Sequence, residues 1–313
     1  MAEISVVIPT RDRLALLRRN GLRSALEQED VDHEVIVVDD GSTNGTAAYL
    51  ASLREPRLRV VRRDNPGGMA ASRNAGIAAV ETEWVAFLDD DDLWAPRKLR
   101  VQLDEAERSR ADLVYAGAVA VDDRGTVLYE LVLPDPHEVR EKLRRACVVP
   151  AGASNVIVRT ELVRAVGGFD ESLPTVADWD LWLSLADRGT FACCPEILVG
   201  YVLHSQNSHA LDNSMTEVDE LVRKHAAASP PRAVTPDRLG YARWMAAQRS
   251  RAGLHRAAAA IYLRTAVAHR SPGSLLRAAD ALTGKRLSRT LRGSDRGRLP
   301  SAPAPDWLRR FAA

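Results

Sequence analysis

The chain has 313 residues, of which 46% are hydrophobic and 27% charged, so it can form one large domain and an additional region. The net charge of +1 hides an asymmetry, because residues 230–313 hold 17 basic and 4 acidic side chains while residues 1–229 hold 26 and 38. No stretch approaches 18 uninterrupted apolar residues, which excludes a membrane span, and the first residues do not resemble a signal peptide.

Three cysteines, Cys147, Cys193 and Cys194, show neither an even count nor the spacing of metal ligands. This pattern argues against a disulfide framework or a zinc site. We therefore expect a cytoplasmic protein. The basic region could also meet an anionic partner, such as the inner face of the membrane, or it could be a solvated helical surface.

The first 90 residues alternate between short apolar runs and segments with helical spacing. The expected strands are residues 4–8, 34–38, 58–61 and 84–88, and the helices between them start near Leu14, Thr43 and Met69. This alternation predicts an α/β fold with a parallel sheet that is covered on both faces. Ligands of such sheets bind beyond the carboxyl ends of the strands.

After residue 95 the pattern is mixed. The expected helices are residues 96–109, 138–146 and 178–187, and the expected strands are 113–121, 126–132, 155–159 and 197–203. Ser229-Pro230-Pro231 marks a boundary. Beyond it, residues 237–251, 254–269 and 272–281 are expected to be helical, followed by a loose end with Trp307 and Phe311 as anchors. We expect one domain over residues 1–229, with halves that meet near residue 95, and a basic helical extension over residues 230–313.

Four consecutive acids, Asp89 to Asp92, follow the strand at residues 84–88. Their mutual repulsion at the end of a buried strand is unfavourable, and a divalent cation relieves it. Oxygen ligands suit Mg²⁺ or Mn²⁺. The sequence therefore predicts a metal site here, with a solvated acidic loop as the alternative.

Polar residues also follow the first two strands. Pro9–Arg13 follows the first strand, and Asp39 and Asp40 end the second. A carboxylate at such a position can accept hydrogen bonds from a nucleoside. Capping of the following helices, by Asp12 or by Ser42 or Asp40, is the alternative.

Two glycine-containing segments lie farther along the chain. Gly67-Gly68 precedes a predicted helix, where backbone N–H groups favour an anion, but the segment lacks the ending of a phosphate-binding loop. Gly167–Asp170 is followed by Asp178 and Asp180 at the start of another helix. Acids in a first turn commonly interact with the helix dipole, which accounts for one of these two.

Together these segments resemble the family 2 glycosyltransferases, which have the GT-A fold. The resemblance covers about residues 3–206 and is specific because six motifs occur in order. The motifs are Ser5–Thr10, Val37–Ser42, Ser72–Gly76, Phe87–Asp92, Gly167–Asp170 and Asp178–Trp182. The resemblance implies a Rossmann-like, mostly parallel sheet with a nucleotide-binding half before residue 95 and an acceptor half after it.

The resemblance also implies roles for the matching residues. The donor would contact Pro9, Thr10, Arg11, Asp39, Asp40, Arg73, Asp89 and Asp90. Asp91 and His204 would hold Mn²⁺ or Mg²⁺, although a lone histidine is as often structural. Asp178 would be the general base.

The implied activity is the inverting transfer of one sugar from a nucleotide-diphosphate sugar, most often a UDP-sugar, in glycan, cell-surface polysaccharide or glycoconjugate biosynthesis. The acceptor hydroxyl would belong to a glycan, a lipid-linked or a small molecule, and no nucleic acid is expected. Two departures stand out: Ala177 replaces a frequent Glu, and Gly240 replaces the Gln that precedes Arg243-Trp244 in processive synthases. We therefore expect single transfer.

Two other classes of protein share part of this pattern. A sugar-nucleotide nucleotidyltransferase would show a Gly-rich, Arg-containing loop after the first strand, unlike Pro9–Arg13. A non-catalytic nucleotide-sugar-binding protein would not require the full set of acids.

Overall fold

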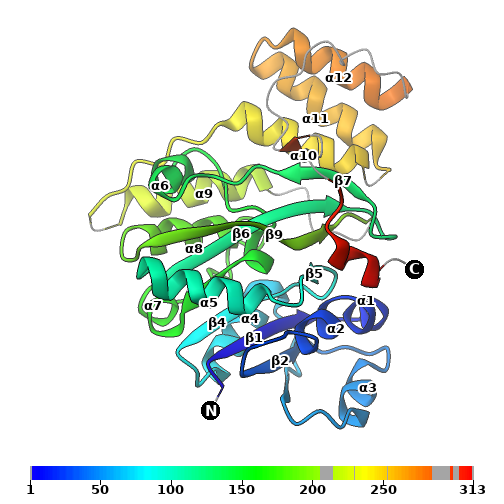
Figure 1. Cartoon of the computed structure of the whole chain (residues 1–313). Helices are drawn as coiled ribbons and strands as arrows, with labels where there is room; N and C mark the ends of the chain where they lie inside the picture. Colours follow the sequence, from blue (N-terminus) through cyan, green and yellow to red (C-terminus); the bar gives the residue numbers. More distant parts are fainter. Residues whose placement is uncertain are drawn as a thin grey trace.

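The computed structural model describes residues 2–204, 214–228, 230–251, 253–283, 297–298 and 303–311. These residues form a mixed α/β fold around a mostly parallel sheet (Figure 1). The strands are β1 (Ile4–Thr10), β2 (His33–Asp39), β3 (Leu58–Arg62), β4 (Trp84–Phe87), β5 (Leu93–Trp94), β6 (Leu113–Val121), β7 (Val127–Leu131), β8 (Ile157–Arg159), β9 (Phe191–Val202) and β10 (Gly297–Arg298). Their order is β10-β7-β6-β8-β4-β1-β2-β3, with β9 beside β6 and β5 beside β9.

The helices of the described residues fall between and after these strands. They are α1 (Leu14–Arg19), α2 (Gly21–Leu26), α3 (Thr46–Ser52), α4 (Gly68–Ala79), α5 (Lys98–Ser109), α6 (Pro136–Leu143), η1 (Gly152–Asn155), α7 (Thr160–Ala165), α8 (Ala177–Ala186), α9 (Ser214–Ala226), α10 (Arg238–Arg251), α11 (His255–Ala268), α12 (Pro272–Thr283) and η4 (Asp306–Phe311). No described helix has the length and apolar character needed to cross a membrane.

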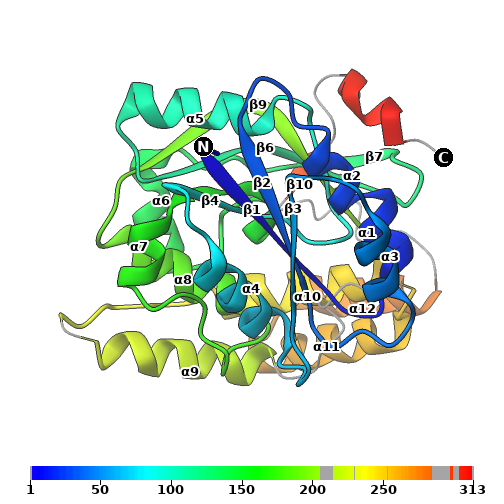
Figure 2. The same cartoon turned by 90° about the horizontal axis from the view of Figure 1, so that it is seen from below.

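The predicted parallel strands are confirmed. β1 pairs in parallel with β2 and β4, and β3 extends the sheet beyond β2. The apolar side chains of β1 divide between two clusters: Val7 packs with α4 and α8, while Val6 packs with α2 and α5. Figure 2 shows these strands between the two sets of helices. Burial on both faces explains why the strands are continuous apolar runs.

A glycine brings α4 close to the sheet. A Cβ atom on Gly76 would lie 2.3 Å from a methyl carbon of Val7. Only glycine therefore allows α4 to approach β1 this closely. The approach fixes the position of Arg73, one turn earlier on the same helix.

The single helix predicted from Leu14 is two helices, α1 and α2. The break lies at Asn20, whose side-chain amide donates to the Asp91 carbonyl at 2.6 Å. The backbone N–H of Gly21 donates to the Asp90 carbonyl, and a Cβ on Gly21 would lie 2.9 Å from the Asp89 carbonyl oxygen. The chain thus breaks the helix in order to pack against the acidic turn.

Strand β9 begins earlier than predicted. Residues 191–194 pair with β6, and the register shifts where Pro195 and Glu196 form a bulge opposite Gly117. A Cβ on Gly117 would lie 2.7 Å from the Glu196 carbonyl oxygen, so the bulge requires glycine there. Proline cannot donate to a ladder, and a bulge accommodates it within the strand. Strand β5 and helices α7 and α9 were not predicted.

The predicted C-terminal helices are present as α10, α11 and α12. Helix α10 packs on the main body through Tyr241 and Met245, whereas α11 and α12 form a hairpin farther out (Figure 1). Trp307 and Phe311 anchor η4, since the Trp307 indole donates to the Ile197 carbonyl at 3.1 Å and Phe311 is buried. The loose end was predicted from Ser294 onward. In it, residues 297–298 form β10 and residues 306–311 form η4, while residues 294–296, 299–302 and 312–313 lie outside the described residues. The predicted domain boundaries remain predictions.

Candidate active site

The polar segments predicted from sequence meet at one edge of the sheet. Strands β1, β2 and β4 are parallel and end at Thr10, Asp39 and Phe87. Asp89 follows β4 after Leu88, and His204 follows β9 after Leu203. The carboxyl ends of these strands therefore deliver the candidate residues to one site.

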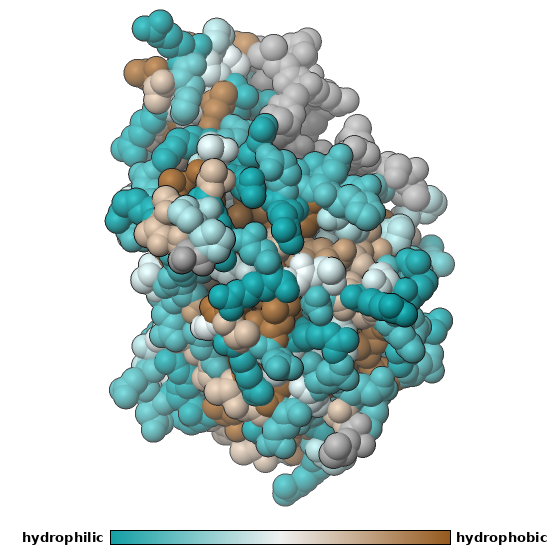
Figure 3. Space-filling view, turned by 90° about the vertical axis from the view of Figure 1, so that its left-hand side faces the viewer, coloured by the Kyte–Doolittle hydropathy of each residue, from teal (hydrophilic) through white to brown (hydrophobic). Residues whose placement is uncertain are grey.

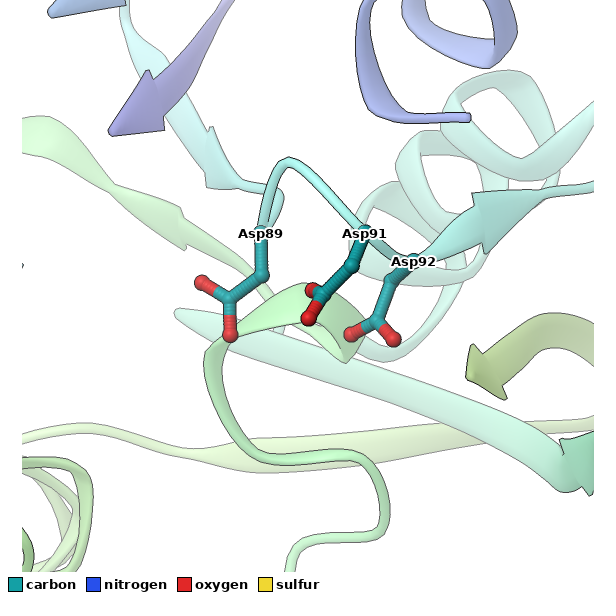
Figure 4. Close-up of side chains that lie close together, drawn as sticks. All are labelled: Asp89, Asp91 and Asp92. Atoms are coloured by element: carbon teal, nitrogen blue, oxygen red, sulfur yellow. The ribbon is translucent and has the colours of Figure 1, made fainter. Parts of the chain in front are cut away.

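Three of the four consecutive acids point the same way. Carboxylate oxygens of Asp89, Asp91 and Asp92 lie within 4.8 Å of one another, on a turn closed by a hydrogen bond from the Asp92 N–H to the Asp89 carbonyl (Figure 4). Asp91 and Asp92 are buried. Hard oxygen donors in this arrangement fit Mn²⁺ or Mg²⁺. Sequence alone did not single out Asp92, because adjacency does not reveal which side chains converge.

Asp90 is not one of the three convergent carboxylates. It accepts a hydrogen bond from the Thr10 hydroxyl at 2.8 Å and pairs with the Arg13 guanidinium at 3.0 Å. Thr10 and Asp90 were both predicted to contact the donor, and the structure brings them together. Asp90 thereby links the end of β1 to the acidic turn.

His204 and Asp91 are adjacent, as their predicted shared role requires. The His204 Nε2 atom lies 2.7 Å from Asp91 Oδ2, and the Arg13 guanidinium contacts the same carboxylate oxygen at 2.5 Å. Arg13 lies 3.0 Å from His204 Nε2 as well. Sequence reasoning placed Arg13 in the polar loop but gave it no role.

Arg73 joins the acidic cluster to the predicted general base. Its guanidinium donates to Asp89 at 2.5 Å and to Asp178 at 2.8 Å, and it stacks 5.1 Å from the centre of the Phe169 ring. Arg73 is buried, and although burial alone would lower its pKa, Asp89 and Asp178 raise it. Arg73 is therefore a fixed cation between the two groups of acids.

Asp178 lies in the first turn of α8 and faces η1. Its Oδ2 atom accepts a hydrogen bond from the Ala153 N–H at 3.0 Å. A Cβ on Gly152 would lie 2.6 Å from the same oxygen, and Gly152 has a positive φ of 54°. A glycine at this position lets the carboxylate approach the backbone. The sequence gave no signal for η1.

The other predicted donor residues have structural partners. Asp40 accepts hydrogen bonds from the N–H groups of Gly67 and Gly68, at 3.0 and 2.8 Å, and pairs with Arg63 at 2.7 Å. Its carboxylate thus occupies the N-terminus of α4, where the sequence left a phosphate possible. Asp39 pairs with Arg62 at 2.6 Å.

Pro9 and Arg11 differ in exposure. Pro9 is buried within β1, and Arg11 is exposed beyond the strand end. Asp12, considered as a helix cap, instead accepts a hydrogen bond from the Thr43 N–H at 2.7 Å. The predicted contacts of these residues and of Asp39 and Asp40 with a nucleotide remain predictions.

The site carries an excess of negative charge. In the part of the chain that the structure describes, the carboxylates of Asp89 to Asp92 and Asp178 pair with two guanidinium groups, those of Arg13 and Arg73. Asp91 also contacts His204. Burial raises the pKa of Asp89 and Asp92, and it raises the pKa of Asp90 to about 7. Burial opposes ionisation of Asp91 too, but His204 and Arg13 outweigh it and lower that pKa. A divalent cation would offset this excess.

The raised pKa of Asp90 predicts a pH-dependent stability. Between the ordinary value of 3.8 and about 7, folded Asp90 keeps a proton that the unfolded chain has released, so the free energy of unfolding falls as pH rises. In EDTA, the Tm of the wild type relative to Asp90→Asn is expected to fall from about pH 5 to about pH 8. Differential scanning calorimetry measures this difference.

The Asp90→Asn variant is the reference because His33 acts in the opposite direction. Burial lowers the pKa of His33, so this residue adds stability as pH rises, and both proteins contain it. A Tm difference that stays constant or grows with pH would contradict the raised pKa of Asp90.

A cavity of about 500 Å³ extends from the acidic cluster. Its lining includes Arg13, Asp89, Asp91 and Asp178, and also Tyr241, Trp244 and Gln248 of α10. The rings of Trp179, Tyr241 and Trp244 pack in series, with centroids 6.2 and 5.8 Å apart. Helix α10, predicted as part of an extension, thus forms a wall of the site.

We compared the chain with known protein families, proteins and structures. Residues 5–159 match the family described as "Glycosyl transferase family 2". The succinoglycan biosynthesis protein ExoO of Rhizobium meliloti is 32% identical over 200 residues, covering 58% of this chain and 55% of that protein. An uncharacterized glycosyltransferase of Rickettsia conorii is 28% identical over 227 residues, covering 70% and 37%. The chain therefore spans about half and about a third of these two relatives.

Two solved structures share the fold. Staphylococcus aureus TarS in complex with UDP-GlcNAc superposes with a TM-score of 0.61 at 17% identity, covering 89% of this chain and 81% of that one. Mannosyltransferase PcManGT from Pyrobaculum calidifontis, in complex with GDP-Man and Mn²⁺, has a TM-score of 0.57 at 20% identity, covering 93% and 83%. Fold and site together define a glycosyltransferase with a GT-A fold. The chain belongs to glycosyl transferase family 2, through residues 5–159.

Proposed function

We propose that this enzyme transfers a single sugar, with inversion, from a UDP-sugar to an acceptor hydroxyl. One observation carries the proposal: Asp178 and the carboxylates of Asp89 and Asp91 line the same cavity. This arrangement offers a proton acceptor and a site for a metal-bound diphosphate within one space. Family membership favours transfer over nucleotide-sugar synthesis or binding without catalysis.

In the proposed mechanism Asp178 accepts the proton of the acceptor hydroxyl. The Ala153 N–H and the Arg73 guanidinium each hold one oxygen of this carboxylate, so its orientation is fixed before the acceptor arrives. General-base assistance of this kind contributes about 10²–10⁴-fold to a rate. One carboxylate acting on one face of the sugar, without a covalent intermediate, gives inversion.

We propose that Asp89, Asp91 and Asp92 hold Mn²⁺ or Mg²⁺, with His204 beside Asp91. When bound, the ion supplies positive charge to the leaving diphosphate. The fit rests on the convergent carboxylates and on their excess of charge over Arg13 and Arg73. The solved relative PcManGT contains Mn²⁺, which supports the choice of ion.

The nucleotide is proposed to lie over the ends of β1 and β2. Thr10, Arg11, Asp39 and Asp40 are at this edge, and Pro9 precedes them in β1. Arg73 and Asp89 would contact the part of the donor that lies between its nucleoside and Asp178. The complex of TarS with UDP-GlcNAc supports UDP, and the complex of PcManGT with GDP-Man makes GDP the main alternative to test.

The proposed setting is polysaccharide or glycoconjugate biosynthesis in the cytoplasm, with a glycan, a lipid-linked or a small-molecule acceptor. Relatives that are named for polysaccharide synthesis support it, including a hyaluronan synthase of Pasteurella multocida that is 29% identical over 211 residues, covering 66% of this chain and 21% of that protein. The three cysteines are free thiols, which suits a reducing compartment.

The proposal is tested with purified protein and a panel of UDP- and GDP-sugars with Mn²⁺. A true donor is expected to raise the Tm and to release its nucleoside diphosphate slowly in the absence of acceptor. If no nucleotide sugar raises the Tm or is hydrolysed, the donor assignment is wrong. Pyrophosphate release from a nucleoside triphosphate and a sugar phosphate would instead identify a nucleotidyltransferase.

Replacement of Trp244 tests the α10 wall. Trp244→Ala removes a ring that contacts Tyr241 and is expected to raise the acceptor KM about threefold to tenfold. Donor hydrolysis is expected to stay within about twofold of the wild type, because Trp244 packs against Tyr241 of α10 and is not one of the convergent acids or their arginine partners. Steady-state kinetics with each substrate varied measures both quantities.

Trp307→Ala is the matched control, since Trp307 packs against β9 and does not line the cavity. An unchanged acceptor KM in Trp244→Ala would place the acceptor away from α10.

A further inference from the structure

The outer helical hairpin, α11 with α12, exposes apolar side chains to an unusual degree. Val267 is 80% exposed, Leu282 58% and Leu275 51%, and Leu263 is also exposed. Among the large hydrophobic residues that the structure describes as exposed, six of nine lie between Leu254 and Leu282. Figure 3 shows hydrophobic residues interrupting the hydrophilic surface at the end of the molecule that this hairpin forms.

The exposed apolar residues form a stripe on each helix. On α12, the exposed residues Pro272, Leu275, Leu276 and Leu282 and the half-buried Ala279 recur at helical spacing, next to the buried face of Ser274, Ala278 and Ala281. On α11, Ala260, Leu263 and Val267 recur in the same way, and Arg256 begins that stripe. A helix with one apolar face turned outward can lie in the interface of a lipid bilayer, with that face at the boundary between the headgroups and the acyl chains.

The charge of the hairpin is almost all positive. Arg256, Arg264 and Arg270 are exposed, and Asp280 is the single acid in residues 253–283 of the sequence. The next residues in the chain, 284–298, contain six Lys and Arg and one Asp. A second copy of this face would bring like charges together, which opposes a symmetric dimer. Anionic lipid headgroups complement the arginines, and acyl chains complement the leucines.

From this combination we propose that the outer face of α11 and α12 docks on the surface of an anionic lipid bilayer. Leu263, Val267, Leu275 and Leu282 enter the boundary of the acyl chains, and Arg256 and Arg264 contact lipid phosphates. The contact is peripheral and does not depend on the proposed transfer reaction.

The test is flotation of the full chain with two kinds of vesicle, phosphatidylcholine alone and phosphatidylcholine with about one third phosphatidylglycerol. Binding is expected to the anionic vesicles, to weaken as salt is raised, and to fall at least about tenfold in the double variant Val267→Glu, Leu275→Glu. The matched control is Val60→Glu, Leu128→Glu, which makes the same two substitutions at apolar residues that are each 41% exposed, on β3 and β7, and is expected to bind as the wild type does.

Several outcomes would overturn the proposal. These are no binding to anionic vesicles, equal binding to both kinds, and full binding of the Val267→Glu, Leu275→Glu variant. A dimer in light scattering that this variant dissociates would assign the face to self-association instead. The Tm and the donor hydrolysis of each variant, compared with the wild type, show whether it is folded. If the wild type itself hydrolyses no donor, that result contradicts the transfer proposal and leaves the membrane proposal unaffected.

Discussion

Asp178→Asn is expected to lower the rate of sugar transfer by about 10²–10⁴-fold, because the amide cannot accept the proton of the acceptor hydroxyl. The side chain keeps its shape, and its oxygen can still accept a hydrogen bond from Arg73 or from the Ala153 N–H. Donor affinity, measured as the Mn²⁺-dependent rise in Tm with nucleotide sugar, is expected to change little. Turnover is measured as glycosylated product under saturating substrates.

The control for this variant is on the same helix. Asp187→Asn changes the residue at the carboxyl end of α8, away from the cavity lining, and is expected to keep full activity. Undiminished turnover in Asp178→Asn would remove the general-base role. Loss of donor affinity together with turnover would instead indicate that Asp178 acts through its contact with Arg73.

Asp91→Asn is expected to weaken Mn²⁺-dependent donor binding by about 100-fold or more, because it removes a charged oxygen from the three convergent carboxylates. The same variant leaves the neighbouring Arg13 without its closest carboxylate partner. Isothermal titration of the donor in Mn²⁺ and in EDTA measures the metal-dependent part. Equal donor affinity in the two conditions for the wild type would contradict the metal site.

Asp90→Asn provides a comparison within the same turn. Asp90 contacts Thr10 and Arg13 and does not belong to the convergent set, so its replacement is expected to keep most of the Mn²⁺ dependence. If Asp90→Asn and Asp91→Asn lost the Mn²⁺ dependence equally, the four acids would attract the ion through their total charge and not through three specific ligands. The geometry of the turn predicts a clear difference between neighbours.

The framework of the site was predictable because it depends on short-range patterns. Apolar runs of four or five residues marked β1 to β4, and polar motifs directly followed the runs of β1, β2 and β4. Since parallel strands end at one edge, Thr10, Asp39 and Asp89 had to come together once the strands were recognised. His204 was placed near Asp91 by the family resemblance and not by any local pattern.

The details that were missed depend on contacts between distant segments. Asn20 interrupts a helix that its own sequence would continue, because its side chain finds the carbonyl of Asp91. The turn after β4 brings Asp92 together with Asp89 and Asp91, whereas Asp90 contacts Thr10 and Arg13 instead. Tyr241 lies in a segment whose sequence predicts an ordinary amphipathic helix. Its packing against Trp179 in the folded structure shows that it lines the cavity. These three features depend on tertiary contacts, which local sequence patterns do not reveal.

The wall that α10 supplies has a consequence for the biosynthesis of the protein itself. The ribosome delivers the acids, Arg73, Asp178 and His204 before Tyr241 and Trp244 emerge. Until α10 arrives, the ring of Trp179 lacks its partner and the cavity is open on one side. A chain that stops before residue 238 therefore carries Asp89, Asp91 and Asp178 but leaves the ring of Trp179 without Tyr241, and exposed apolar surface of this kind is what chaperones and proteases recognise. The acidic residues therefore enter the polypeptide before the helix that completes the lining of their cavity, and a chain truncated before α10 is expected to be degraded more readily than one that includes it.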